Sequence, residues 1–532
     1  MSETLQLQNT EAGPGLARSA GIIALGNVSS RVLGLIRETV IAHFFGAQGT
    51  VSAFRLASRI PTMTYDLLVG GMLSAALVPV FSGYLAEEKR DELWRAASVV
   101  FSLVAAALGS MVVLLEFTAP TVARLQGKGL GADLLVVMTR LVRLMGPAIL
   151  FFGLSGVVTG LLYSLKRFTL PAVAAAAYNL GIVVAAPLLA GQLDIYSLGV
   201  GAVLGAMLQL LLQLPALRGG SLRFSLDFSH PALRHILRLY LPIGLGVAIS
   251  NAQVAIDGRL ASHAGESVAA WMDYATRIVQ FPHGLVAVAI SLAALPSLAR
   301  SCAVNDTVGY RRTFGMGLRM VVVLIVPAAV GLWVLAEPVI ALVFQHGDFT
   351  ALDTAWVSLA LRGYLLGLVF AAVDWPLNYA FYARQDTLTP ALVGVISVGV
   401  YLAVGLSWVG PLGMLGLVLA DTAKHFSHVL VMLILTWRRM GSLRGLGLGW
   451  ALLKAAVASA FMAIVVLVVV GWIERAVGGE GTVAWLAIVG GGGGAGLSVY
   501  LIVGWALRVK ELGQIFYVAR QRLASRNPDL TG

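Results

Sequence analysis

The sequence predicts an all-α polytopic membrane protein with about 14 transmembrane helices, and three features of its composition support this fold class. Of its 532 residues, 58% are hydrophobic and only 12% are charged, whereas about a quarter of a soluble domain is charged. Apolar runs of about 20 residues, long enough to cross a bilayer, recur from Gly21 to Leu507. The 60 glycines also suit a membrane, where small residues let helices approach closely.

The apolar runs define the expected helices. They cover residues 21–46, 51–82, 96–118, 135–163, 170–191, 195–216, 236–261, 267–297, 315–344, 353–381, 389–409, 412–436, 450–473 and 483–507. The net charge of +11 does not indicate a nucleic-acid binder, because the basic residues lie between the apolar runs. The single cysteine, Cys302, excludes an internal disulfide and a cysteine-rich metal site.

Basic residues in the loops set the expected orientation. One side of the membrane receives nearly all the loop arginines and lysines, whereas the opposite loops contain little beyond Arg124, Lys128 and Arg475. By the positive-inside rule, both termini are expected in the cytoplasm. No cleavable signal peptide is evident, because the first apolar run is long and contains Arg31 and Arg37.

An internal repeat organises the helices into two lobes. Ala-Ser-Arg-Ile at 57–60 recurs as Ala-Thr-Arg-Ile at 275–278, an offset of 277 − 59 = 218, and further echoes keep offsets of 217 to 219. Six helices per repeat give both lobes one orientation, a parallel pseudo-repeat. The expected organisation is a disordered tail (1–18), an N-terminal lobe (19–220), a C-terminal lobe (221–440), two further helices (441–508) and a basic cytoplasmic tail (509–532).

Five arginines within the expected helices are the candidate substrate-binding residues: Arg31, Arg37, Arg55, Arg59 and Arg277. The first two lie roughly 15 and 24 Å into the first helix at about 1.5 Å per residue. Intramembrane charges of this kind line water or meet an anion. A guanidinium fork donates two hydrogen bonds to a phosphate at once, so a lipid diphosphate is a natural ligand.

A structural alternative for these arginines stays open. Glu38 and Asp66 could neutralise some of them, while Arg55 and Arg59 reach the outer interface. Under that interpretation the arginines stabilise the fold and bind no substrate.

Four segments resemble the MviN/MurJ family of lipid II flippases. Residues 30–38, Ser-Arg-Val-Leu-Gly-Leu-Ile-Arg-Glu, with Phe-Gly-Ala at 45–47, are similar to its first-helix motif. Residues 274–284, 344–350 and 381–390 resemble its eighth-helix motif, the loop before helix ten and the entry to helix eleven. The resemblance runs along almost the whole chain.

The resemblance implies a multidrug/oligosaccharidyl-lipid/polysaccharide exporter fold, with two six-helix lobes around a cavity and a lipid-tail groove on the last two helices. It also implies that Arg31, Arg37 and Arg277 hold the substrate diphosphate. This chain has Ser52 where the family usually has an acidic residue, and Tyr65 where it has a further arginine.

The implied function is translocation of lipid II, the undecaprenyl-diphosphate-linked muropeptide, to the outer leaflet of the bacterial inner membrane. Transport would proceed by alternating access and serve peptidoglycan biosynthesis and cell shape. No bond is made or broken, so no enzyme activity and no cofactor are expected. The expected partners are lipid II, membrane lipids and cell-wall synthesis proteins, with no nucleic acid.

Coupling to a Na⁺ or H⁺ gradient or to the membrane potential is also expected, by resemblance to cation-driven members of the family. Asp257 and Asp421 are the suitably placed carboxylates, with Asp257 deeper in its helix. Asp257 could instead pair with Arg259 or carry a proton. His425 and His428 share a helical face with Asp421 and are expected to form a solvated or packed cluster.

Two other functions stay open at this point. A carrier of the same fold could export drugs or another polyprenyl-linked oligosaccharide. A cavity poorer in cations would favour a drug exporter, so the arginines argue against that function. A membrane enzyme acting on lipid-linked sugar would need acidic or histidine groups gathered in an outer loop. In those loops Asp348 and Glu480 are isolated.

Overall fold

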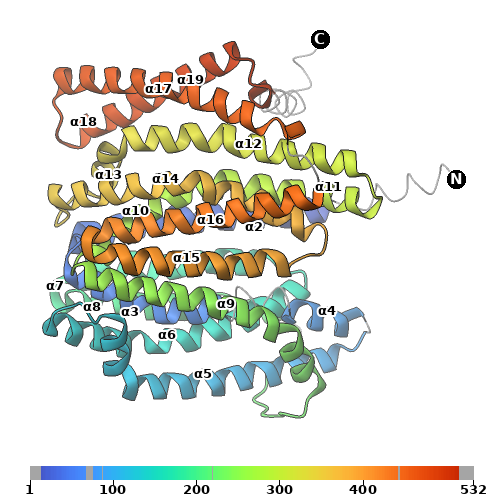
Figure 1. The fold of residues 1–532 in the computed structure, drawn as a ribbon. Helices are drawn as coiled ribbons and strands as arrows, with labels where there is room; N and C mark the ends of the chain where they lie inside the picture. The colour runs from blue at the N-terminus through green and yellow to red at the C-terminus, as the bar shows by residue number, and fades with distance from the viewer. Residues whose placement is uncertain (1–13, 68–75, 87, 219, 441–443, 514–532) are drawn as a thin grey trace, which may run out of the picture. The chain divides into compact units, whose positions relative to one another are not determined.

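A computed structural model describes residues 14–67, 76–86, 88–218, 220–440 and 444–513, and every regular element in these ranges is helical (Figure 1). Eleven helices among the described residues are long and apolar enough to cross a membrane. These features confirm the all-α membrane fold class, and the count of fourteen stays a prediction. Residues 1–13 and 514–532 of the expected tails lie outside the described residues.

The chain divides into two compact units, which are described separately. The first unit comprises residues 1–270 and 347–349, and the second comprises residues 271–346 and 350–532. The helix at 231–264 therefore belongs to the first unit. The lobes 19–220 and 221–440 describe a duplication in the sequence and stay a prediction.

The first unit is built from long helices that pack as neighbours in pairs. They are α2 (Pro14–Phe45), α3 (Gly49–Tyr65), α4 (Val78–Ala86), α5 (Arg90–Gln126), α6 (Ala132–Ser164), α7 (Thr169–Leu193), α8 (Tyr196–Leu211), a 3₁₀ turn η2 (Leu214–Leu217) and α9 (Pro231–Ala264). α2 packs on α7, α3 on α6, α5 on α6 and α7 on α8. α2 begins at Pro14, inside the expected tail, and proline is favoured at the first turn of a helix.

Loops of the first unit gather at one end. The Gly131 amide donates to Glu266 Oε1 at 3.2 Å, which joins the loop after α5 to the loop after α9. The Asp348 amide donates to the His43 carbonyl at 3.0 Å, beside the end of α2. All these loops are expected on the outer side of the membrane, so this grouping agrees with the expected alternation of crossings. The side that they face stays a prediction.

The second unit contains the remaining elements. They are α10 (Val268–Pro282), a π-helical turn η3 (His283–Val288), α11 (Ala289–Ala303), α12 (Thr307–Val334), α13 (Ala336–Phe344), α14 (Ala351–Tyr382), α15 (Leu388–Leu412), α16 (Met414–Met440), η4 (Arg444–Leu446), α17 (Leu448–Val477), α18 (Thr482–Ala487), a second π turn η5 (Ile488–Gly492) and α19 (Gly493–Ala506). Its buried core includes Phe314, Leu318 and Tyr500, and the Tyr500 hydroxyl donates to the Val323 carbonyl at 2.5 Å.

Several expected helices are interrupted, and proline accounts for two of the breaks. The range 267–297 contains the π turn η3 directly after Pro282, because proline supplies no backbone N–H to the helix. The range 315–344 breaks at Leu335, between α12 and α13. Pro338 stands four residues after Val334, where α12 ends, and in a continuous helix its ring would clash with the Val334 carbonyl. In the range 51–82, α3 ends at Tyr65 and residues 68–75 lie outside the described residues.

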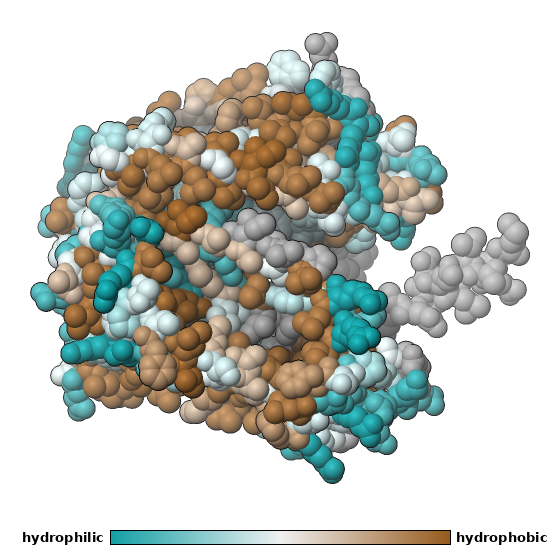
Figure 2. Space-filling view, turned by 60° about the horizontal axis from the view of Figure 1, so that its bottom comes forward, coloured by the Kyte–Doolittle hydropathy of each residue, from teal (hydrophilic) through white to brown (hydrophobic). Residues whose placement is uncertain are grey.

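Large apolar side chains stay exposed on the helices, as expected for a surface in contact with lipid. Trp450, Trp472 and Trp505 are 70%, 72% and 82% exposed. Figure 2 shows extensive hydrophobic surface on one face, with hydrophilic residues towards its edges. A multi-pass membrane protein explains this surface, because a soluble protein rarely exposes large contiguous apolar patches.

Candidate substrate-binding site

A buried carboxylate binds two of the five candidate arginines. Glu38 is 0% exposed and Arg55 is 6% exposed. Arg37 Nε donates to Glu38 Oε1 at 3.1 Å, and a second Arg37 nitrogen donates to the same oxygen. Arg55 donates to the other oxygen, Oε2. The cluster thus holds two guanidinium groups and one carboxylate, a formal charge of +2 − 1 = +1.

Residues of α7 contact the Arg37 guanidinium on the side away from Glu38 Oε1. Its NH1 nitrogen donates to Asn179 Oδ1 at 2.9 Å, and Asn179 Nδ2 donates to the Ser30 carbonyl of α2 at 3.1 Å. The guanidinium also lies 5.7 Å from the Tyr178 ring centroid. The side chain of Arg37 is 11% exposed. It is therefore the most exposed side chain of the cluster, since the Arg55 side chain is only 6% exposed.

The two departures from the family pattern have clear structural environments. The hydroxyl of Ser52 is buried and accepts a hydrogen bond from the Ala270 amide at 3.2 Å. Tyr65 packs on Phe152, with ring centroids 5.0 Å apart, and Phe152 packs on Tyr178 at 5.1 Å. A row of aromatic rings thus leads from Tyr65 to the ring beside Arg37.

Arg59 joins α3 to α9 within the first unit. Its NH1 nitrogen donates to the Val254 carbonyl at 2.9 Å, and its NH2 nitrogen lies 3.7 Å from Asp257 Oδ2. A Cβ at Gly258 would lie 2.1 Å from Arg59 NH1. A side chain at position 258 would therefore require the Arg59 guanidinium to shift from its place against α9. Asp257 pairs with Arg59, a partner that the sequence did not indicate.

The remaining two arginines, Arg31 and Arg277, have different local surroundings. Arg31 is exposed on α2, six residues before Arg37, a separation that leaves the two side chains about 120° apart around the helix axis. Arg277, in the second unit, lies 3.4 Å from Asp273 one turn earlier on α10. The structure therefore unites Arg37 with Arg55 and describes Arg31, Arg59 and Arg277 in other surroundings.

The candidate ion-coupling residue Asp421 also has basic neighbours. Lys424 Nζ donates to Asp421 Oδ1 at 2.5 Å, and His425 Nε2 lies 3.7 Å from Oδ2. His428 is buried, and its Nδ1 lies 2.5 Å from Asp374 Oδ1 of α14. The histidines are thus packed within the second unit. Among the described residues, no group of three or more histidine, cysteine, aspartate and glutamate side chains could hold a metal ion.

A family model described as Lipid II flippase MurJ matches residues 41–483 of this chain. The chain belongs to the MurJ family. A lipid II flippase MurJ from Burkholderia cenocepacia is 32% identical over 379 residues, which cover 69% of this chain and 73% of that protein. A probable lipid II flippase MurJ from Vibrio cholerae is 30% identical over 427 residues, covering 78% of this chain and 81% of its own length.

Solved structures share the fold of this MurJ family member. A lipid II flippase MurJ in an inward closed conformation aligns with a TM-score of 0.77 and 22% identity, over 93% of this chain and 99% of that one. An inward-facing multidrug transporter of the MATE family aligns with a TM-score of 0.63 and 16% identity, over 78% of this chain and 96% of that one. At these identities the likeness concerns the fold alone.

Two polar partners of the candidate arginines were not identified from the sequence. Asn179 is separated from Arg37 by 142 positions, and nothing in its local pattern marks it. Asp273 could have been found, because it stands four residues before Arg277 on the same helical face. The sequence predicted that Glu38 could neutralise some of the arginines, and in the structure it pairs with Arg37 and Arg55.

Proposed function

We propose that this chain is a flippase that moves lipid II from the cytoplasmic to the outer leaflet of the bacterial inner membrane. Membership of the MurJ family, whose description names lipid II, is the observation that carries the proposal. The activity is transport, with no bond made or broken. The fold is shared with a MATE transporter, but the matches along the sequence favour a lipid carrier over a drug exporter.

In the proposed mechanism, Arg37 binds the diphosphate of the substrate. Its side chain is held by Glu38 and Asn179 and stays 11% exposed. The cluster has a formal charge of +1, so an anion would gain a net attraction there. Arg55 acts as a positioning residue, because its contact with Glu38 Oε2 fixes the carboxylate that orients Arg37. Arg31 and Arg277 are proposed to contact the same diphosphate during alternating access.

Substitution of Arg37 tests this role. Arg37→Ala should lower lipid II binding about ten- to hundredfold, the equivalent of losing one charge-assisted contact of about 1.5–3 kcal/mol. Arg37→Lys should restore binding only in part, because lysine lacks the bidentate fork. Arg143→Ala is the matched control, since its pair with Glu116 is about half exposed and lies outside the cluster.

The measurement uses purified variants and labelled lipid II, together with rescue of cells depleted of their own flippase. Parental binding by folded Arg37→Ala, Arg31→Ala and Arg277→Ala would contradict the diphosphate site. Failure of the parent to rescue depleted cells would contradict the proposed function itself.

Ion coupling is proposed to involve Asp257. Asp257 pairs with Arg59 at 3.7 Å and is expected to lie deeper in its helix than Asp421, which pairs with Lys424 at 2.5 Å. Asp257→Asn should therefore alter transport driven by a Na⁺ or H⁺ gradient more than His425→Gln or His428→Gln does. Unchanged transport by Asp257→Asn under both gradients would remove this role.

A further inference from the structure

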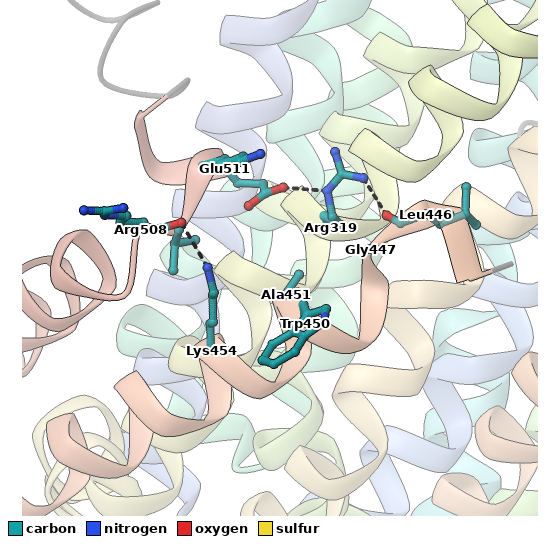
Figure 3. A pocket seen from close by; sticks show the side chains of 11 residues that line it. Arg319, Leu446, Gly447, Trp450, Ala451, Lys454, Arg508 and Glu511 are labelled. Atoms are coloured by element: carbon teal, nitrogen blue, oxygen red, sulfur yellow. Dashed lines mark hydrogen bonds and ion pairs between the residues drawn. The ribbon is translucent and has the colours of Figure 1, made fainter.

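A basic cavity lies in the second unit. It has a volume of about 360 Å³. As Figure 3 shows, it forms where the start of α17 approaches Arg319 of α12 and the segment that follows α19. Four of its lining side chains are cationic, namely Arg319, Lys454, Arg508 and Lys510, and one, Glu511, is anionic. Its formal charge is therefore +4 − 1 = +3.

Glu511 is already engaged by one of these cations. Arg319 Nε donates to Glu511 Oε1 at 2.5 Å, and Arg319 NH1 donates to the Leu446 carbonyl at 2.6 Å. Lys454 Nζ donates to the backbone carbonyl of Arg508 at 3.2 Å (Figure 3). This contact holds the ammonium group beside the cavity without neutralising its charge.

Glu511 pairs with Arg319, and no second carboxylate among the described residues lines the cavity. Within the described part of the chain, no ion pair joins Lys454, Arg508 or Lys510 to an acidic side chain. Lys510 and Arg508 are exposed, and Lys454 is half-buried. Three such cations around one cavity repel each other, and an anion bound among them would relieve the repulsion.

The surroundings of the cavity are those of a membrane interface. Lys454 lies six residues after the start of α17, about 9 Å along the helix. Trp450 lines the cavity and is 70% exposed, while Trp505, near the end of α19, is 82% exposed. Tryptophan is enriched at the level of lipid headgroups. The same end of two neighbouring helices thus carries both basic and interfacial side chains.

An apolar stripe continues from the cavity along α17. Leu453, Val457 and Phe461 are 53%, 37% and 54% exposed, and their spacing of four residues places them on one face of the helix. A soluble phosphate would use only the cations. A ligand with a phosphate and acyl chains would use both the cations and this stripe.

We propose that this cavity binds the phosphate headgroup of an anionic glycerophospholipid, with its acyl chains along the exposed face of α17. Lys454 supplies a point charge, and Arg319, oriented by Glu511 and the Leu446 carbonyl, supplies a planar donor. In the expected topology this end of α17 faces the cytoplasm, where anionic lipid attracts basic segments. The site goes beyond the substrate site proposed above and needs no lipid II.

The test measures retention of phosphatidylglycerol and phosphatidylcholine by the purified full chain in detergent, using native mass spectrometry. The parent should prefer phosphatidylglycerol, and Lys454→Met with Arg508→Gln should weaken its binding at least about tenfold, as expected for lost charge-assisted contacts. Lys128→Met with Arg475→Gln is the matched control, because both residues are exposed basic side chains that do not line the cavity.

Each outcome decides the proposal. Equal binding of both lipids by the parent, or parental phosphatidylglycerol binding by the double variant, would overturn it. Inorganic phosphate, added to the complex with phosphatidylglycerol, should displace this lipid only weakly. Full displacement of phosphatidylglycerol at equal concentration would identify a soluble phosphate site instead. The single variant Lys454→Met, with the thermal unfolding midpoint of each protein, provides the same readout if the double variant fails to fold.

Discussion

At the scale of single residues, buried charges in this chain are matched by carboxylates. The sequence predicted a patch of five arginines, and the structure pairs Arg37 and Arg55 with Glu38 and Arg59 with Asp257. Such pairing follows from the cost of an uncompensated charge away from water. The residue types of the site were therefore predictable. The contact with Asn179 was not, because it depends on how α7 packs against α2.

Glu38 should be essential for stability, because it binds two guanidinium groups in a buried position. We expect Glu38→Gln to lower the free energy of unfolding by about 3–5 kcal/mol, since removal of one member of a buried pair leaves its partner's charge uncompensated. Glu116→Gln, which breaks a half-exposed pair with Arg143, should cost at most about 1 kcal/mol. Denaturant unfolding in detergent measures both, and equal losses would contradict the buried role.

At the scale of helices, the sequence predicted where apolar runs lie but not where they break. Pro282 and Pro338 explain two interruptions once their positions are known, yet many helices here contain a proline without a break, such as Pro147 in α6. Tertiary contacts decide which prolines interrupt a helix. For the same reason the close contact between α7 and α8 could be suspected from glycine content but not located.

Three glycines allow α7 and α8 to touch. A Cβ at Gly181 would lie 2.5 Å from the backbone of Gly201 and Gly205, closer than any real contact. We expect Gly181→Ala to destabilise the protein by about 1–3 kcal/mol through overpacking. Gly191→Ala is the control on the same helix, where nothing lies within 4 Å, and it should be neutral or stabilising by up to about 1 kcal/mol. Thermal unfolding of both variants distinguishes them.

The loop between α14 and α15 should contribute acid-sensitive stability. Burial raises the pKa of Asp386, but hydrogen bonds from the Thr389 amide and hydroxyl and the nearby Arg439 outweigh burial and lower this pKa to about 2. The unfolded pKa is about 3.9, so the unfolded state binds the proton first as the pH falls. The contribution is therefore complete above about pH 4 and is lost as the pH falls towards 2.

Asp386→Asn tests this contribution. The variant should be less stable than the parent at pH 6, and the difference should shrink as the pH is lowered from about 4 to about 2. Unfolding by denaturant in detergent across that range gives both values. A difference that stays constant down to pH 2 would show that the carboxylate charge has no part in it.

At the scale of the whole molecule, the sequence predicts an even number of crossings with both termini in the cytoplasm. The single cysteine makes this directly testable, because Cys302→Ser removes the only thiol in the chain. New cysteines can then be placed at exposed loop positions. Lys128 and Glu480 are expected outside, and Lys166 and Asn305 are expected inside.

We expect a membrane-impermeant thiol reagent, added to intact spheroplasts, to label Lys128→Cys and Glu480→Cys but neither Lys166→Cys nor Asn305→Cys. The physical reason is that basic loop residues resist translocation, and most of them lie in loops expected on the same side as the second pair of sites. Permeabilised membranes should label all four variants, which controls for the accessibility of each thiol. Labelling of Lys166→Cys from outside would reverse the orientation. Labelling of only one of Lys128→Cys and Glu480→Cys from outside would instead show an odd number of crossings between them, whereas ten are expected.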